Sequence, residues 1–76
     1  MTLYEFNMLS QKDKETVVFE QSEFLHVETI DGLKYGLYAK DTFFIEAVCF
    51  TDSLKVRDIT AFDSGELINK YLELLK

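Results

Sequence analysis

His26 and Cys49 are the chain's only histidine and only cysteine, so they are the first candidates for nucleophilic or metal chemistry. A nucleophilic pair needs the two side chains within hydrogen-bonding reach, and a metal site needs several ligands at compatible spacing. The strand register chosen below puts His26 and Cys49 on opposite faces of a sheet. We therefore expect no metal and no cofactor. Cys49 is interpreted as a small buried core residue and His26 as a half-exposed sheet residue near Tyr38 or Glu28.

Glu28 and Glu46 are candidates for the paired carboxylates of glycoside chemistry. They are predicted to share a sheet face, but two strands apart they would lie about 10 Å from each other. Lys34 is predicted to lie between them, which favours a charge ladder over a catalytic pair. Phosphate-binding glycine loops and a Gly-x-Ser-x-Gly motif are also absent from the sequence. The sequence thus predicts a protein that is not an enzyme, and a small-ligand site built from His26, Glu28, Tyr38 and Glu46 is the weakest alternative.

The length and composition indicate one small globular domain over residues 1–76, with 47% hydrophobic and 29% charged residues. A single cysteine excludes an intramolecular disulfide framework, which small secreted domains usually carry. The first residues show no signal-peptide pattern, and no apolar run approaches the roughly 20 residues that span a bilayer. We expect a cytoplasmic protein that does not bind membranes.

The net charge of −6 is concentrated toward the N-terminal half. Between Lys14 and Lys34 there are five acids and no lysine or arginine. This distribution favours a basic partner and argues against nucleic-acid binding, which needs cationic side chains for the phosphates. A solvated acidic face that aids solubility is the alternative interpretation.

Two helices are predicted before the central strands. A hydroxyl followed three residues later by an acid, beginning at Thr2, predicts a short helix over about 3–8. Ser10 is the predicted N-cap of a second helix that runs to about Gln21. The β-branched and aromatic residues over 16–20 leave a strand there as the alternative.

Asp31-Gly32 lies between two stretches typical of strands, which predicts a β-hairpin. A two-residue loop would place His26 opposite Leu37. A three-residue loop would place Leu25 opposite Leu37 and would keep one face of the sheet apolar. We choose the three-residue loop because it separates apolar from charged side chains.

The same choice is made at Lys40-Asp41-Thr42, where a three-residue loop pairs Ala39 with Phe43. A fourth strand is predicted over about 55–62, with a bulge near Arg57-Asp58 because its alternation is broken. One face then carries Leu25, Val27, Leu33, Tyr35, Leu37, Ala39, Phe43, Ile45, Ala47 and Cys49. The other face carries Phe24, His26, Glu28, Lys34, Gly36, Tyr38, Phe44, Glu46, Val48 and Phe50.

The C-terminal residues predict an amphipathic helix capped by Asp63 or Ser64. Its apolar side chains follow helical spacing and form one stripe: Leu67, Ile68, Tyr71, Leu72 and Leu75. The predicted fold class is therefore α+β, with N-terminal helices, a four-stranded antiparallel β-meander and a C-terminal amphipathic helix packed on the sheet.

Three short stretches carry a resemblance: the opening Tyr4-Glu5-Phe6-Asn7-Met8-Leu9-Ser10, the strand Phe43-Phe44-Ile45-Glu46, and the helix start Phe62-Asp63-Ser64. In these stretches the chain resembles a group of short uncharacterised bacterial proteins. The resemblance covers most of the chain and implies a single complete domain. It implies no activity.

The second of these sheet faces, which mixes aromatic and charged side chains, is the predicted binding surface. Its apolar residues are Phe24, Tyr38, Phe44, Val48 and Phe50, and a soluble monomer seldom leaves so much apolar surface in water. The alternative is that the N-terminal helices cover this face. Otherwise we predict a small acidic cytoplasmic protein-interaction module (a binder, adaptor or inhibitor) or a homo-oligomer, such as a homodimer, that pairs this face with itself. The predicted protein-binding residues are the aromatics Tyr38, Phe44 and Phe50 and the acids Glu20, Glu23 and Glu28.

Overall fold

The computed structural model describes residues 1–63. They form two short helices, a π-helical turn and four strands, an α+β arrangement in which the helices precede an antiparallel meander. These parts of the predicted fold are confirmed. The predicted C-terminal amphipathic helix and its packing lie outside the described residues and stay a prediction.

Helix α1 (Leu3–Asn7) begins where the capping pattern predicts. The Thr2 hydroxyl accepts a hydrogen bond from the Glu5 N–H at 3.1 Å, and the Glu5 carboxylate accepts one from the Thr2 N–H at 2.8 Å. Together the two bonds satisfy backbone donors that a helix start leaves unpaired. The hydrogen bond from the Thr2 backbone also lowers the pKa of the Glu5 carboxyl, because it stabilises the charged form.

Helix α2 (Gln11–Thr16) begins after Ser10, whose hydroxyl accepts a hydrogen bond from the Asp13 N–H at 3.2 Å. The chain continues without a break into the π-helical turn η1 (Val17–Gln21). Residues 16–20 are therefore helical, and the alternative of a strand there is wrong. Val17 and Val18 become buried, so packing overrides their β propensity.

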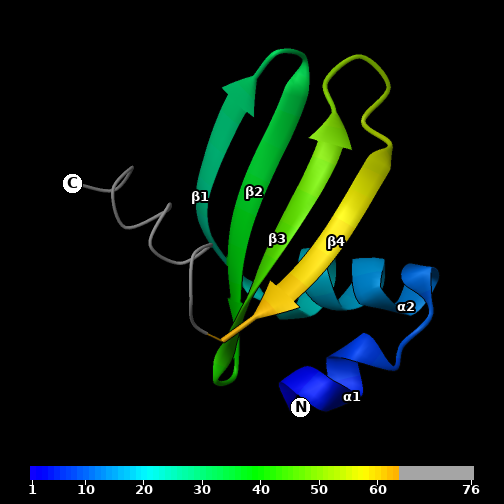
Figure 1. The fold of residues 1–76 in the computed structure, drawn as a ribbon, viewed down its shortest axis with the longest axis vertical. Coiled ribbons are helices and arrows are strands. Elements are labelled where there is room, and N and C mark those ends of the chain that lie inside the picture. Colours follow the sequence, from blue (N-terminus) through cyan, green and yellow to red (C-terminus); the bar gives the residue numbers. More distant parts are fainter. Residues whose placement is uncertain (64–76) are drawn as a thin grey trace.

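The sheet contains β1 (Glu23–Ile30), β2 (Leu33–Lys40), β3 (Phe43–Phe50) and β4 (Val56–Phe62), in that order and antiparallel. In Figure 1 the helices lie behind one face of this sheet, across the half that contains the turn between β2 and β3. The chain order and the strand order are the same, so each strand pairs with its neighbour in sequence.

Both hairpin loops contain two residues, and the predicted three-residue loops are wrong. Ile30 pairs with Leu33 across Asp31-Gly32, and Lys40 pairs with Phe43 across the second turn. Asp31 and Gly32 have φ values of 50° and 79°, the left-handed values that a type I′ turn requires at both central residues. This turn is favoured because its twist matches the twist of the two strands that it joins.

The two-residue loops redistribute the side chains between the two faces. We call the face under the helices the helix face and the other the reverse face. The register places on the helix face Phe24, Val27, Thr29, Lys34, Gly36, Tyr38, Phe43, Ile45, Ala47, Cys49, Val56, Ile59 and Ala61. It places on the reverse face Glu23, His26, Glu28, Ile30, Leu33, Tyr35, Leu37, Ala39, Phe44, Glu46, Val48, Phe50, Asp58, Thr60 and Phe62.

Two bulges interrupt the ladders. In β4, Val48 pairs with Asp58 and Cys49 with Val56, so Arg57 is the extra residue and the predicted bulge is confirmed. In β1 the extra residue is Leu25, which the sequence analysis did not predict. This bulge brings Phe24 onto the helix face, whereas strict alternation would place it beside His26 on the reverse face.

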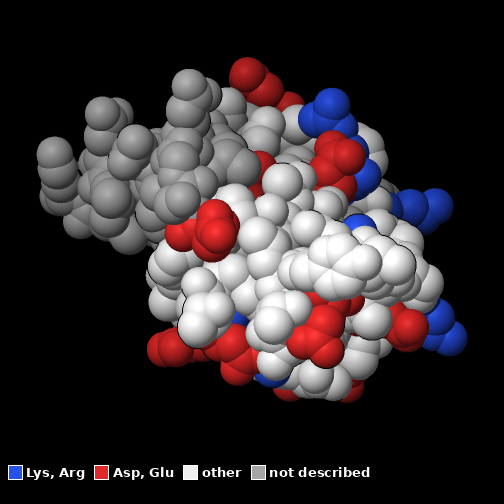
Figure 2. Space-filling model, turned by 60° about the horizontal axis from the view of Figure 1, so that its bottom comes forward, with Lys and Arg blue, Asp and Glu red and all other residues white. Residues whose placement is uncertain are grey.

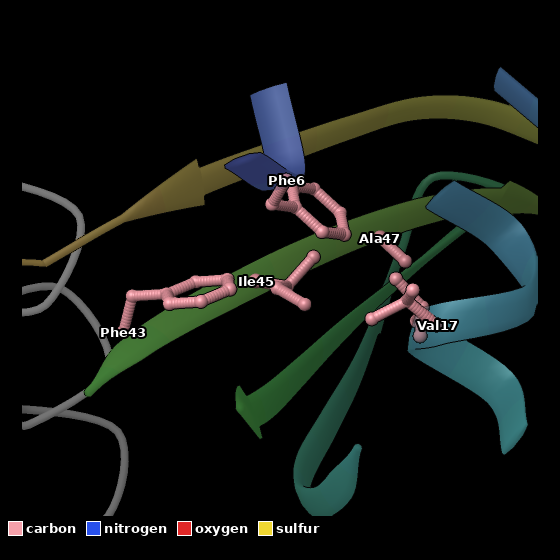
Figure 3. Packing of buried hydrophobic residues seen from close by; sticks show 6 residues of the cluster. Phe6, Val17, Phe43, Ile45 and Ala47 are labelled. Atoms are coloured by element: carbon pink, nitrogen blue, oxygen red, sulfur yellow. The ribbon is translucent and has the colours of Figure 1, made fainter. Parts of the chain in front are cut away.

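The main core lies between the helices and β3. Figure 3 shows Phe6 of α1 and Val17 of η1 beside the side chains that β3 projects from the helix face. The buried cluster consists of Phe6, Val17, Val18, Phe43, Ile45 and Ala47. A smaller cluster, Leu37 and Phe62 with the half-buried Phe44 against it, lies on the reverse face.

Replacing Leu54 with asparagine is expected to stabilise the protein by about 1 kcal/mol. Leu54 has φ 59° in the loop between β3 and β4, and 69% of its surface is exposed. Asparagine tolerates the left-handed conformation better than leucine, and little packing is lost. Thermal unfolding should show a higher midpoint for Leu54→Asn and a lower one for Leu54→Val, whose branched side chain fits this conformation worst. The opposite order would contradict backbone strain at this position.

Candidate functional site

The predicted binding aromatics do not form one surface. Tyr38 lies on the helix face, whereas Phe44 and Phe50 lie on the reverse face, so the predicted shared face is wrong. Phe44 is half-buried and stacks on Phe62 with 5.9 Å between ring centroids. Phe50 is exposed at the end of β3, beside the loop to β4. The error follows directly from the loop length, because one residue of shift moves a side chain to the opposite face.

Tyr38 instead belongs to a cluster with two other rings. Its ring centroid lies 5.9 Å from that of Phe19 and 5.7 Å from that of Phe24, and both contacts are edge-on. We call Phe19, Phe24 and Tyr38 the aromatic cluster. Edge-to-face contacts stabilise such a group beyond its buried area. The cluster therefore presents a preformed set of rings at the junction of η1, β1 and β2.

The outer rings of the aromatic cluster face the solvent. Phe19 is 48% exposed and Phe24 is 56% exposed, while the central Tyr38 is half-buried. Burial raises the pKa of the Tyr38 hydroxyl, with a smaller contribution from Cys49, so the hydroxyl keeps its proton at neutral pH. Gly36 gives this ring its space, because a Cβ atom at that position would lie 2.9 Å from Tyr38 Cε1.

Acidic side chains flank the aromatic cluster along the chain. Glu20 follows Phe19 in η1 and Glu23 precedes Phe24 in β1, and both acids are exposed. One base is nearby, since Lys40 Nζ donates a hydrogen bond to the Gln21 carbonyl at 3.3 Å. On the face of the molecule drawn in Figure 2, acidic groups lie around neutral areas and most of the visible basic groups lie on the right.

Glu28, the third predicted acid, lies on the reverse face like Glu23, but farther along β1 from Phe24. Its Oε2 lies 3.3 Å from His26 Nε2, which confirms the expected closeness of these two residues. The predicted ladder through Lys34 is wrong, because Lys34 pairs with Thr29 and Cys49 on the helix face.

The four residues nominated for a ligand site do not converge. His26, Glu28 and Glu46 share the reverse face, but Tyr38 lies on the other side of the sheet. Leu37 separates His26 from Glu46 in the cross-strand row. Among residues 1–63 no group of three or more histidine, cysteine, aspartate or glutamate side chains could hold a metal ion.

Cys49 and His26 lie on opposite faces, as predicted, although through a different register. Cys49 is half-buried rather than fully buried. Burial raises the pKa of its thiol, Lys34 acts in the opposite direction and Glu15 adds to the increase. A raised pKa leaves little thiolate at neutral pH, which is the wrong direction for a nucleophile.

The strand β1 carries the densest exposed apolar surface in the described part of the chain. Four of its eight residues are large exposed hydrophobics: Phe24 (56%), Leu25 (39%), Val27 (42%) and Ile30 (45%). β1 is an edge strand, paired only with β2 among the described strands. Exposed apolar side chains on a sheet edge are typical of an association surface.

Phe19 is not among the predicted site residues, and Phe24 is on the predicted binding face but is not among the predicted protein-binding residues. Their sequence signal is a pair of phenylalanines on either side of two acids, Glu20 and Glu23. With the two-residue first loop, the contact of Phe24 with Tyr38 requires the bulge at Leu25. No helix in residues 1–63 is long and apolar enough to cross a membrane.

Comparison of the chain with protein-family models, with curated proteins and with solved structures finds no match.

Proposed function

We propose that this chain is a small, non-enzymatic protein-interaction module that binds a basic partner through the aromatic cluster and its flanking acids. The observation that carries the proposal is the exposure of Phe19 and Phe24 on either side of Tyr38, with the exposed Glu20 and Glu23 next to these two rings in the chain. A cytoplasmic location is part of the same proposal.

Aromatic rings supply the contact area of such a site. Tyrosine and phenylalanine are enriched in interface cores, and a few aromatic anchors usually carry most of the binding energy. Here the rings already contact one another in the unbound chain. Since they are held in place before binding, less side-chain entropy is lost on association.

The chemistry of the partner follows from the charges around the rings. Guanidinium groups stack on aromatic faces and pair with carboxylates, so an arginine-rich surface would use both parts of the site. The chain between Lys14 and Lys34 adds a negative field that speeds association with a basic protein. The binder, adaptor and inhibitor roles share this recognition step.

The test is affinity capture on immobilised protein, at low and at high salt, with variants at each half of the site. Phe24→Ser removes an exposed ring, and Glu20→Lys reverses one flanking charge. We expect both to lose the same captured basic protein, and high salt to release it from the wild type. Leu54→Ser is the matched control, because Leu54 is an exposed apolar residue in the distant loop between β3 and β4.

The proposal fails if every protein captured by the wild type is also captured by Phe24→Ser and by Glu20→Lys. It also fails if Leu54→Ser loses the partner as completely as they do. Circular dichroism spectra of all three variants show whether the fold is intact, which is expected because Glu20, Phe24 and Leu54 are all exposed.

A further inference from the structure

Among the described residues, the outer edge of β1 carries none of the lysines or prolines that commonly protect a sheet edge. Natural edge strands are commonly blunted by lysine, proline or short length. β1 is eight residues long and contains no lysine, arginine or proline. The opposite edge, β4, carries exposed Arg57 and Asp58 at its bulge. β1 has its own bulge at Leu25 and two acids, but its ladder from His26 to Ile30 is regular and contains no lysine or arginine, so we take β1 as the edge that accepts another strand.

The register of the first hairpin indicates which backbone groups face outward from β1. Across a two-residue type I′ turn, Ile30 and Leu33 form the directly hydrogen-bonded pair. Because hydrogen-bonded and non-bonded pairs alternate, Glu28 and His26 also direct their backbone groups toward β2. Val27 and Thr29 then direct their N–H and C=O groups away from the sheet, in position for a further antiparallel strand.

We propose that a second copy of this chain pairs its β1 antiparallel to this edge, with a two-fold axis through Val27. The axis runs perpendicular to the sheet, so the two reverse faces lie on one side and the two helix faces on the other. Two sheets of four strands then form one continuous sheet. This inference concerns self-association and does not depend on the basic partner proposed above.

The charges along β1 select this register. With Val27 opposite itself, His26 lies opposite Glu28 of the partner subunit, and the same pair forms a second time by symmetry. Each pair joins an imidazole N–H donor to a carboxylate on the reverse face, where His26 and Glu28 already lie 3.3 Å apart within one chain. A cross-strand hydrogen bond from a donor to a carboxylate stabilises the pairing.

The neighbouring symmetric registers are less favourable. An axis through Glu28 would place two carboxylates directly opposite each other, which is destabilising. An axis through His26 would place two imidazoles opposite each other and leave Glu28 without a polar group across the seam. The bulge at Leu25 ends regular pairing beyond that residue, so the ladder is short and its register depends on the three residues at its centre.

Among the described residues, the surroundings of the β1 edge are compatible with a second copy. The described helices extend past the β4 side of the sheet and not past the β1 side (Figure 1). Val27, 42% exposed in the single chain, would be buried at the centre of the seam. Both aromatic clusters would lie on the helix-face side, one on each side of the seam.

The test measures the mass of the full chain by sedimentation equilibrium across a dilution series. The wild type is expected to form a concentration-dependent dimer. Val27→Lys places two ammonium groups together at the axis and should raise the dimer dissociation constant by tenfold or more, on the order expected for like charges at a seam. Leu54→Lys adds the same charge at a distant exposed position and should leave the dimer unchanged.

A pair of charge variants tests the register itself. His26→Glu faces Glu28 of the partner subunit with a second carboxylate, and Glu28→Lys faces His26 of the partner subunit with a second cation-forming group. Each variant alone should dimerise more weakly than the wild type. Mixed in equal amounts, they should form a heterodimer, because both cross-strand pairs then join a carboxylate to a donor.

Two results would overturn the proposal. One is a wild type that stays monomeric at the highest concentration. The other is a dimer that Val27→Lys does not weaken, which would place the interface elsewhere on the chain. If Val27→Lys fails to fold, the mixture of His26→Glu and Glu28→Lys decides, and absence of a heterodimer peak would reject this register.

Discussion

Replacing Phe6 with alanine is expected to lower the free energy of unfolding by about 3–5 kcal/mol. Phe6 has no exposed surface and is the only buried residue of α1. Its ring lies 5.7 Å from that of Phe43 at the centre of the main core, and Lys14 Nζ lies 5.9 Å from the ring centroid. The substitution removes both contacts and leaves a cavity between α1 and β3.

The expected loss is large compared with the total stability, which is roughly 4–11 kcal/mol for a domain of this length. Urea unfolding followed by circular dichroism measures it. Tyr4→Ala is the control on the same helix, because Tyr4 is 73% exposed, and it should change stability by no more than about 0.5 kcal/mol. Equal losses for the two variants would show that α1 does not anchor the helices to the sheet through Phe6.

Replacing Leu37 with alanine is expected to cost about 2–5 kcal/mol, although Leu37 lies on the face opposite the helices. It is 1% exposed, belongs to a buried cluster with Phe62, and lies between His26 and Glu46 in the cross-strand row. Removing its side chain leaves a cavity in the centre of the reverse face.

Leu33→Ala is the graded comparison for Leu37, since Leu33 lies on the same strand and the same face but is only half-buried. Denaturant unfolding of the two variants should give the larger loss for Leu37→Ala. A loss for Leu37→Ala as small as that of an exposed residue would show that the reverse face contributes little to the stability of the fold.

The two proposals about interaction reinforce each other in one respect. A dimer formed through β1 would present two aromatic clusters on the same side of a continuous sheet. A partner with two basic sites at matching separation would then bind more tightly than the affinity of either site alone suggests. The flanking acids of each cluster, Glu20 and Glu23, would stay accessible because they do not lie at the centre of the seam.

The local patterns of the sequence predicted the elements well. Thr2 and Ser10 begin their helices through side-chain hydrogen bonds to the backbone, an interaction confined to four residues. The bulge at Arg57 was predicted because the apolar alternation of the fourth strand breaks there. Features that depend on contacts between near neighbours in the chain could be read from residue types alone.

The register of the sheet could not be read in this way. In β3, Phe43, Ile45 and Ala47 face the helices while Phe44, Val48 and Phe50 face the other way, so apolar residues occupy both faces. An alternating pattern selects a register only when one face is polar. Both the two-residue and the three-residue loops gave sheet faces that could be buried. The three-residue loops were chosen because they group the apolar residues of β1 and β2 with Phe43 and Ile45, and that choice was wrong.

By itself the sequence determined the helix starts, the antiparallel meander, and the acidic stretch between Lys14 and Lys34. Only the tertiary structure decided that Tyr38 joins Phe19 and Phe24 rather than Phe44 and Phe50. The physical reason is the two-residue second loop, which pairs Lys40 with Phe43 and so places Tyr38 opposite Ile45 rather than Phe44. The bulge at Leu25 keeps Phe24 opposite Tyr38 although the first loop is also shorter than predicted. Which face a side chain occupies depends on pairing across strands, and residue types along one strand do not encode it.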